Sequence, residues 1–480
     1  MEPVRVRFAP SPTGYLHVGG LRTALYNYLL AKRHHGSFIL RIEDTDQTRK
    51  VEGAVENLIS SLEWAGIEFD EGPGRDGAVG PYVQSQRLSM YKKFARELVD
   101  AGKAYYCFCT PERLEQVREK AAAEKRALVY DRHCREIPAA EAQARVDAGE
   151  PHVVRMKVPL EGEVTFEDQI RSKVTIANAI LDDQVLVKSD GFPTYHMAVV
   201  VDDHAMGITH VIRGEEWLPS TPKHILLYQF FGWNVPKFAH LPLLLNPDGS
   251  KLSKRQGDVA VEDYRAKGYL KEALVNFIAF LGWNPGDTRE IFSMQELIDE
   301  FSIDRVGKSG AIFNLEKLQW LNQQHIRVKP EGELLELVRP MFAEKGWTRL
   351  PDEYLKRVIG FLKDRITVIP DFGTECIFFY EDPVVFEEKG RTKNWGPDTP
   401  KHMALLLEKY EAAAEFTAAE TERLLRQTAE ELGIGAGKLI HPLRLASTGV
   451  SLGPSLFHVL ELLGRETTLR RLRYALETMK

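Results

Sequence analysis

The sequence predicts an α/β protein: a doubly wound parallel sheet with an inserted segment, followed by an all-helical region. Three observations lead to this prediction. Residues 5–62 alternate strand and helix patterns, which is typical of a parallel sheet. The pattern changes over residues 104–190 and the alternation resumes at residue 191. Beyond Gln319, apolar residues recur at helical spacing.

Size and composition exclude several classes of protein. With 480 residues, the chain is long enough for roughly three or four domains. Its 44% apolar and 28% charged residues are typical of a globular protein, not a disordered one. A net charge of −6 argues against a uniformly basic surface, although a local basic face remains compatible with it. Residues 1–10 contain no secretory signal, and the most apolar stretch, residues 273–283, is too short to cross a bilayer. We therefore expect a cytoplasmic protein.

The individual elements follow from local patterns. Residues 5–9 alternate as a strand, and the proline-rich turn at residues 10–14 ends it. A helix ending before Gly36 and a strand over residues 38–42 come next, and then a second helix over residues 51–62. Further along, we expect strands over residues 153–158, 197–201 and 207–212, a helix over residues 222–231, and a helix that begins with the capping sequence Thr417 to Glu420.

The first turn and helix contain Pro-Ser-Pro-Thr-Gly-Tyr-Leu-His-Val-Gly-Gly at residues 10–20. A helix N-terminus attracts phosphate, glycines let a base or ribose approach the backbone, and the imidazole of His17 can donate to an oxyanion. The segment therefore predicts a nucleotide site, although it matches neither the phosphate loop of ordinary kinases nor the dinucleotide fingerprint. The alternative is a turn in which His17 has no chemical role.

A second segment, Lys-Leu-Ser-Lys-Arg at residues 251–255, follows a turn-rich stretch. Taken alone, a run of this kind is more often a solvated basic surface loop. Together with residues 17–20 it resembles the HIGH and KMSKS signatures of class I aminoacyl-tRNA synthetases, with two departures in each signature. The resemblance implies a Rossmann-type catalytic domain, in which His17 and Lys254 neutralise the phosphates of ATP. It also implies an ATP site that contains His17, Gly19, Gly20, Glu216, Trp217, Lys251, Ser253 and Lys254.

Four further segments indicate which amino acid is bound. Residues 7–14, 41–46, 190–196 and 211–217 closely resemble glutamyl-tRNA synthetases, in the correct order. The resemblance implies that Arg7 and Arg213 hold carboxylates, Glu43 the ammonium, Ser11 a carboxylate oxygen and Tyr195 the side-chain end of glutamate. This set suits a substrate with two carboxylates and one ammonium. For Arg213 and Glu43, the alternative is a structural ion pair at the rim of the sheet.

Three of the four cysteines lie close together in the sequence, as Cys107, Cys109 and Cys134. In an intracellular chain, such a cluster favours a closed structural zinc site over a disulfide. Some bacterial glutamyl-tRNA synthetases carry a Cys-x-Cys pair and a later Cys-x-His here, but Glu136 replaces that histidine in this sequence. Candidates for the fourth ligand are Tyr130, His133 and Glu136. The alternative is three buried cysteines without a metal.

The resemblance also implies a domain organisation and partners. The catalytic domain would span residues 1–103 and 191–245, with an acceptor-binding insertion at 104–190, a KMSKS and stem-contact region at 246–322 and a helical anticodon-binding region at 323–480. Partners would be tRNA(Glu), glutamate, ATP and Mg²⁺, and the family is usually monomeric and needs bound tRNA before it activates glutamate. A basic run near the C-terminus is a candidate for phosphate contacts or for a solvated helix face: Arg465, Arg470, Arg471 and Arg473.

Three other functions share parts of this pattern. A truncated paralogue that glutamylates a modified tRNA base lacks the helical region found here after Gln319. A glutaminyl-tRNA synthetase usually has a β-rich C-terminal half, which the helical spacing disfavours. A catalytically inert tRNA-binding protein would not need His17, Lys254 or the substrate residues. The sequence leaves open whether tRNA(Gln) is also charged.

Overall fold

The computed structural model describes residues 3–125, 129–252 and 259–479, which form two compact units. The first unit comprises residues 1–266 and 271–321, and the second comprises residues 267–270 and 322–480. Among the helices of the described residues, none combines the length and the apolar character needed to cross a membrane.

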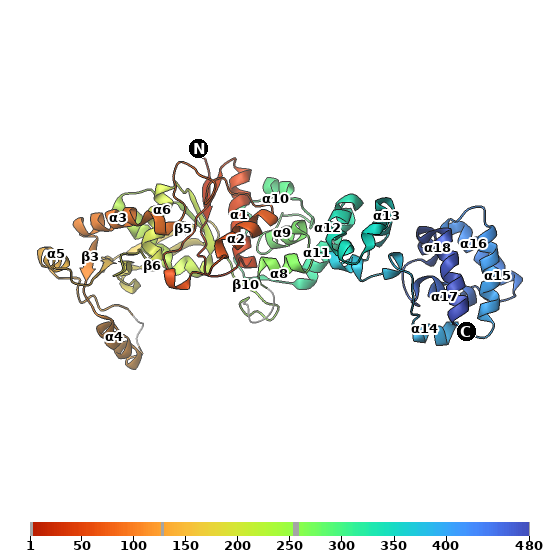
Figure 1. Ribbon diagram of the computed structural model, residues 1–480. Helices are drawn as coiled ribbons and strands as arrows, with labels where there is room; N and C mark the ends of the chain where they lie inside the picture. Colours follow the sequence, from red (N-terminus) through yellow and green to blue (C-terminus); the bar gives the residue numbers. More distant parts are fainter. Residues whose placement is uncertain (1–2, 126–128, 253–258, 480) are drawn as a thin grey trace. The chain divides into compact units, whose positions relative to one another are not determined.

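The first unit contains the strands and most of the early helices (Figure 1). Its strands are β1 (Arg5–Phe8), β2 (Ser37–Leu40), β3 (Ala104–Cys107), β4 (Val153–Met156), β5 (Glu163–Asp168), β6 (Ser172–Ala177), β7 (Val185–Val187), β8 (His210–Gly214), β9 (Lys237–Leu241), β10 (Leu244–Leu245) and β11 (Ala311–Ile312). Its helices are α1 (Val18–Arg33), α2 (Ala54–Trp64), α3 (Leu88–Asp100), α4 (Pro111–Ala123), α5 (Ala139–Asp147), α6 (Tyr195–Ala205), α7 (Thr221–Phe231), α8 (Val261–Ala266), α9 (Lys271–Ala279) and α10 (Met294–Glu300).

A parallel sheet forms the core of this unit, as the sequence predicts. β1 pairs with β2 in parallel, and β8 pairs with β9 in parallel. β8 lies beside β1, where the Thr209 amide donates to the Arg5 carbonyl at 2.9 Å. The strands are short and most of their residues are buried, although β1 keeps the alternation of charged and apolar residues that its sequence shows.

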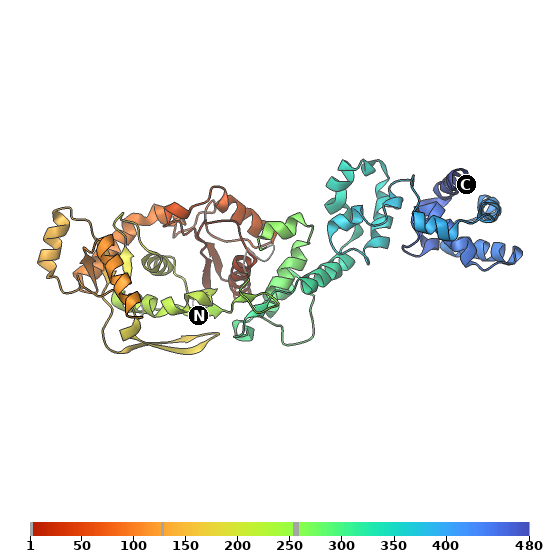
Figure 2. The same ribbon diagram turned by 90° about the horizontal axis from the view of Figure 1, so that it is seen from below.

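The inserted segment has its own antiparallel sheet, in the order β3–β4–β7. A hairpin of β5 and β6, seen as paired yellow arrows in Figure 2, lies between β4 and β7 in the sequence. β5 alternates exposed and buried residues along its length, as expected of a strand with one solvated face. β5 also pairs with β9 at Asp168 and Phe238, so the insertion is joined to the parallel sheet through this strand.

One predicted strand is wrong. Residues 197–201 lie in helix α6, not in a strand. Met197, Val199 and Val201 are each at most 2% exposed, so the helix is buried on every side and shows no amphipathic period. A short buried helix and a buried strand cannot be told apart from an apolar run alone, and valine favours the strand interpretation.

The regular elements of the second unit, among its described residues, are all helices. α11 (Leu315–Val328) crosses the division between the units and is followed by α12 (Glu331–Glu344), α13 (Asp352–Leu362), α14 (Glu388–Asn394), α15 (Thr399–Ala412), α16 (Ala418–Glu431), α17 (Gly437–Thr448) and α18 (Leu456–Thr478). Helices α15 to α18 pack around buried leucines that include Leu406, Leu425 and Leu443. Thr417 caps α16 by accepting from the Glu420 amide, as its sequence predicts.

The arginines near the C-terminus serve the fold of this unit. Arg471 is only 4% exposed and donates to the carbonyls of Phe378 and Ser447, each at 2.7 Å. Arg470 pairs with Asp382. Arg465 and Arg473 contact neighbouring helices or loops through the Ala413 carbonyl and Glu411. Arg471 is therefore a buried structural residue, which corrects its interpretation as part of a solvated face or as a phosphate contact. Arg470 and Arg473 form exposed ion pairs, as expected of a solvated helix face.

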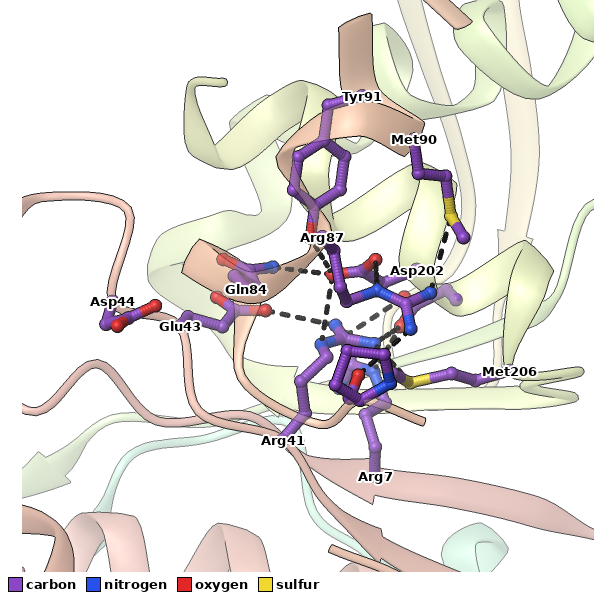
Figure 3. Close-up of polar contacts among 12 residues, drawn as sticks. Arg7, Arg41, Glu43, Asp44, Gln84, Arg87, Met90, Tyr91, Asp202 and Met206 are labelled. Carbon is purple, nitrogen blue, oxygen red and sulfur yellow. Dashed lines mark hydrogen bonds and ion pairs between the residues drawn. The ribbon is translucent and has the colours of Figure 1, made fainter. Parts of the chain in front are cut away.

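A buried group of ionised side chains joins the elements of the first unit (Figure 3). We call it the charge cluster, and it comprises Arg7, Arg41, Glu43, Arg87, Asp202 and Asp203. All six are at most 6% exposed. Their three positive and three negative charges balance. An isolated buried charge is costly, so each member depends on its partners.

The contacts of the charge cluster reach across four segments. Arg41, after β2, donates to Asp203 of α6 at 2.7 Å and to Glu43 at 3.0 Å. Arg87, before α3, donates to Asp202 of α6 at 2.7 Å. Arg7 of β1 donates to Asp203 at 3.0 Å. Helix α6 is thereby fixed against the ends of β1 and β2.

We predict that Arg87→Met destabilises the first unit by about 3 kcal/mol, because it leaves Asp202 buried without its closest cation. The side chains of Arg87 and Asp202 are 1% and 0% exposed. The free energy of unfolding, measured from the urea transition of this unit, checks the prediction. Arg118→Met is the control, since Arg118 and Glu115 form an exposed pair in the same unit. Equal small losses for both variants would contradict the assigned role of the cluster.

Candidate active site

One cavity of about 1120 Å³ brings the predicted site residues of the first unit together. It lies where β1, β2 and β8 end, next to the N-terminus of α1, as expected for ligand sites in open α/β sheets. Of the residues that the sequence singles out, the following line it: Arg7, Ser11, His17, Gly19, Gly20, Glu43, Tyr195, Arg213, Glu216, Trp217 and Lys251. Ser253 and Lys254 lie outside the described residues.

His17 is the N-cap of α1. Its Nδ1 accepts from the Gly20 amide at 3.0 Å, so in the neutral ring the proton is on Nε2. A Cβ atom at Gly19 would lie 3.1 Å from the imidazole, and one at Gly20 would lie 2.9 Å from a methyl group of Leu16. Both glycines therefore keep the ring in place and leave the helix N-terminus open to a ligand.

Arg7 and Glu43 line the cavity as members of the charge cluster. Arg7 is bound by Asp203 through two contacts, at 3.0 and 3.3 Å. Burial raises the pKa of the Asp203 carboxyl, but the attraction of Arg7 and Arg41 outweighs burial and holds the pKa below its ordinary value. Burial raises the pKa of Glu43 above its ordinary value, against the attraction of Arg41. Glu43 forms its ion pair with Arg41 and not with Arg213, so the alternative of a structural ion pair describes Glu43 in this form, although its side chain also lines the cavity.

Arg213, on β8, is 5% exposed and differs from Arg7 in its partners. Its guanidinium donates to the Tyr195 hydroxyl at 3.0 Å and to the Thr221 hydroxyl at 2.8 Å. Throughout residues 3–125, 129–252 and 259–479, no carboxylate lies within 4.0 Å of it. A buried guanidinium whose charge is not neutralised by a carboxylate is suited to bind an anionic group of a ligand.

Two aromatic side chains form the wall beside Arg213. The rings of Tyr195 and Trp217 lie 4.1 Å apart, at an angle of 34°. Burial raises the pKa of Tyr195, so its hydroxyl stays protonated at neutral pH and can donate to an acceptor in the cavity. Trp217 is 36% exposed. Its ring therefore borders the cavity and is not wholly buried in the core.

A second candidate site lies in the insertion. The sulfur atoms of Cys107, Cys109 and Cys134 all lie within 4.8 Å of one another. The Tyr130 hydroxyl lies 3.3 Å from the Cys107 sulfur and 3.2 Å from the Cys109 sulfur. The side chain of Glu136 is 82% exposed and pairs with an arginine, and His133 is exposed as well. Among the three candidate fourth ligands, only Tyr130 reaches the sulfur atoms.

Sequence reasoning missed several groups that surround the predicted residues. Asp203 and Arg41 pair with Arg7 and Glu43, and His224 and His240 contact Arg213. Two adjacent aspartates that end an apolar run, at positions 202 and 203, are the one signal that could have identified a buried ionic site. The histidines gave no such signal, because only the folded chain brings them to Arg213.

Comparisons with known proteins agree with this arrangement. The family described as "tRNA synthetases class I (E and Q), catalytic domain" matches residues 3–320, and the "Anticodon binding domain" matches residues 333–476. A glutamate–tRNA ligase from Chlorobaculum parvum is 53% identical, covering 99% of this chain and 98% of the relative. One from Chlorobium luteolum is 52% identical, covering 99% and 97%. A crystal structure of a glutamate tRNA ligase from Elizabethkingia meningosepticum, in complex with its amino acid, matches all of both chains with a TM-score of 0.94 and 42% identity.

Proposed function

The chain belongs to the glutamate–tRNA ligase family of class I tRNA synthetases, and we propose that it activates glutamate with ATP and transfers the glutamyl group to the terminal ribose of tRNA(Glu). The observation that carries this proposal is the buried Arg213, whose partners among the described residues are neutral. It lies in the same cavity as the glycine-flanked helix N-terminus at His17. One end of the cavity thus suits a carboxylate and the other suits phosphates.

In this proposal, Arg213 and Tyr195 bind the side-chain carboxylate of glutamate. Glu43 accepts from the ammonium, and Arg7 and Ser11 contact the α-carboxylate. Arg7 donates to Asp203, which fixes its guanidinium in one orientation at the cavity wall. Such fixed donors bring the α-carboxylate in line with the α-phosphate of ATP, and the protein need not form a covalent bond.

The phosphates of ATP lie at the N-terminus of α1 in this proposal. His17 donates from Nε2 to a phosphate oxygen as charge develops in the transition state, because its Nδ1 is already occupied by the Gly20 amide. Glu216, Trp217 and Lys251 border the same cavity and complete the ATP site together with Ser253 and Lys254. Mg²⁺ bound to ATP would neutralise phosphate charge and would need no protein cage of its own.

The remaining regions bind tRNA(Glu). We assign the acceptor end to the insertion at residues 104–190 and the anticodon to the helical region at residues 323–480, which the match to an anticodon-binding domain supports. Unstacked anticodon bases would be recognised on their edges. We further propose that the chain works in the cytoplasm as a monomer.

We also propose a structural zinc ion bound by Cys107, Cys109, Cys134 and Tyr130. Tetrahedral zinc with thiolate bonds of about 2.3 Å separates its sulfur ligands by about 3.8 Å. The distance of 3.6 Å between the sulfur atoms of Cys109 and Cys134 fits this geometry, as does the Tyr130 hydroxyl beside two sulfur atoms. Bound zinc would tie the end of β3 to the loop that contains Tyr130 and Cys134.

Charging of purified tRNA tests the proposed function. We expect labelled glutamate, and not labelled glutamine, to be attached to tRNA(Glu) in the presence of ATP and Mg²⁺. A parallel reaction with tRNA(Gln) distinguishes an enzyme specific for tRNA(Glu) from one that also charges tRNA(Gln). If tRNA binds but receives no amino acid, the chain is an inert tRNA-binding protein and the proposal fails.

We predict that His17→Ala lowers the rate of glutamyl-adenylate formation by about 100- to 1,000-fold, because it removes a donor aimed at the developing phosphate charge. The measurement is ATP–pyrophosphate exchange in the presence of tRNA(Glu), with tRNA affinity measured in parallel. His35→Ala, beyond the other end of α1, is the control. Lys254→Ala should likewise lower the rate far more than the affinity. Equal losses of rate and tRNA affinity would make these residues RNA contacts instead.

Elemental analysis tests the zinc site. Protein purified without added metal should contain about one zinc ion per chain, as a closed structural site does. Cys134→Ser should lose most of this zinc, and Tyr130→Phe should release it faster to a chelator, because each variant removes one ligand. His133→Ala is the control and should keep its zinc. A fully folded protein without zinc would show that the cysteines only pack against one another.

A further inference from the structure

Arg213 is surrounded by acceptors that carry no charge. A guanidinium has five N–H groups and no acceptor. Those of Arg213 are directed at His240 Nε2 (3.0 Å), the Tyr195 hydroxyl (3.0 Å), His224 Nδ1 (3.3 Å), the Thr221 hydroxyl (2.8 Å) and the Trp217 carbonyl (3.5 Å). The side chain is therefore held in one orientation by hydrogen bonds, while no anionic side chain in the described part of the chain contacts it directly.

The contact with His240 fixes the protonation of that ring. Because the Nε–H of Arg213 can only donate, His240 must accept at Nε2, and its proton is then on Nδ1. Nδ1 lies 2.6 Å from Asp168 Oδ2 and donates to it. His240 and Asp168 are 0% and 3% exposed, so water does not compete for these bonds. Burial lowers the pKa of His240, although the bond to Asp168 acts in the opposite direction. The ring is therefore neutral at pH 7.

Asp168 is itself oriented by the backbone. Its Oδ1 accepts from the amides of Ile170 at 3.0 Å and Arg171 at 2.8 Å, which leaves Oδ2 for His240. The chain of donors and acceptors thus runs from the backbone to Asp168, from Asp168 to His240 and from His240 to Arg213. The imidazole of His240 lies between the Asp168 carboxylate and the Arg213 guanidinium, so these two charged groups are not in direct contact.

Arg7, in the same cavity, shows the alternative arrangement. It touches Asp203 directly, through two contacts, and its charge is neutralised within the protein. A substrate carboxylate would have to compete with that carboxylate for Arg7. At Arg213 it competes only with neutral groups, which hold a guanidinium less strongly than an ion pair does.

We propose that Asp168 and His240 are positioning residues for glutamate recognition: His240, with its proton fixed on Nδ1 by Asp168, orients Arg213 without neutralising it. This inference rests on the proposed role of Arg213 in binding the side-chain carboxylate. Neither residue lines the cavity, so each acts through Arg213 and not by touching the substrate.

Asp168→Asn tests the proposal with almost no change in volume. The backbone amides require the oxygen of the new side chain at Oδ1, which turns its NH₂ group towards His240 Nδ1. The ring must then accept there and carry its proton on Nε2, facing the Nε–H of Arg213. Such an inverted tautomer disables a catalytic histidine in the serine protease triad, when its aspartate is replaced by asparagine.

We expect Asp168→Asn to raise the KM for glutamate by about tenfold or more in the charging of tRNA(Glu), while the KM for ATP changes little. His240→Leu should have the same effect. His240→Gln should restore much of the affinity, because its amide oxygen can accept from Arg213. The split between the two KM values and the rescue by glutamine are changes that a merely structural role would not produce.

Measurements in the Arg213→Gln variant distinguish a failure of this inference from a failure of the proposed function. Arg213→Gln should itself raise the KM for glutamate, and adding Asp168→Asn to it should raise the KM no further. If Arg213→Gln leaves the KM for glutamate unchanged, the proposed role of Arg213 fails. If Arg213→Gln raises it but Asp168→Asn and His240→Leu do not, the positioning role alone is overturned. The same holds if Asp168→Asn adds its full effect in the Arg213→Gln background.

Discussion

The ion pair between Arg7 and Asp203, with Arg41 on the same carboxylate, is the interaction on which the catalytic unit depends. It joins the first strand to helix α6 across 196 residues of sequence. The charges at 0–3% exposure are stable only because each has a partner. Glu43 and Asp202 belong to the same network. The charge cluster therefore fixes both the ends of the strands and the side of the cavity that Arg7 and Glu43 line.

Because the charge cluster is balanced, it adds no net charge to the cavity. Arg213 then contributes a positive charge that no carboxylate of the described residues contacts, and hydroxyls, imidazoles and a carbonyl hold its side chain. Glutamate carries one more negative charge than glutamine. A cavity built in this way favours glutamate through charge as well as through hydrogen bonds, since an unpaired buried cation gains most from an anionic ligand.

Much of the site could be predicted from the sequence. The turn at residues 10–14, the helix after His17 and the strand ends that carry Arg7 and Arg213 have local signatures, and one cavity contains them. The partners of these residues could not be predicted, because Asp203, His224 and His240 reach them only through the tertiary fold. The same limit explains why residues 197–201 were predicted as a strand, and why the buried contacts of Arg471 were not foreseen. Burial on all sides leaves no periodic pattern in the sequence.

The most direct test of the charge account is the preference for glutamate over glutamine in Arg213→Gln, measured as the ratio of kcat/KM values for charging tRNA(Glu). If the unneutralised charge of Arg213 sets this preference, kcat/KM for glutamate falls by about 100-fold while kcat/KM for glutamine falls much less. The ratio of the two values then decreases sharply. If both values fall by the same factor, Arg213 has only a structural role and the account is wrong.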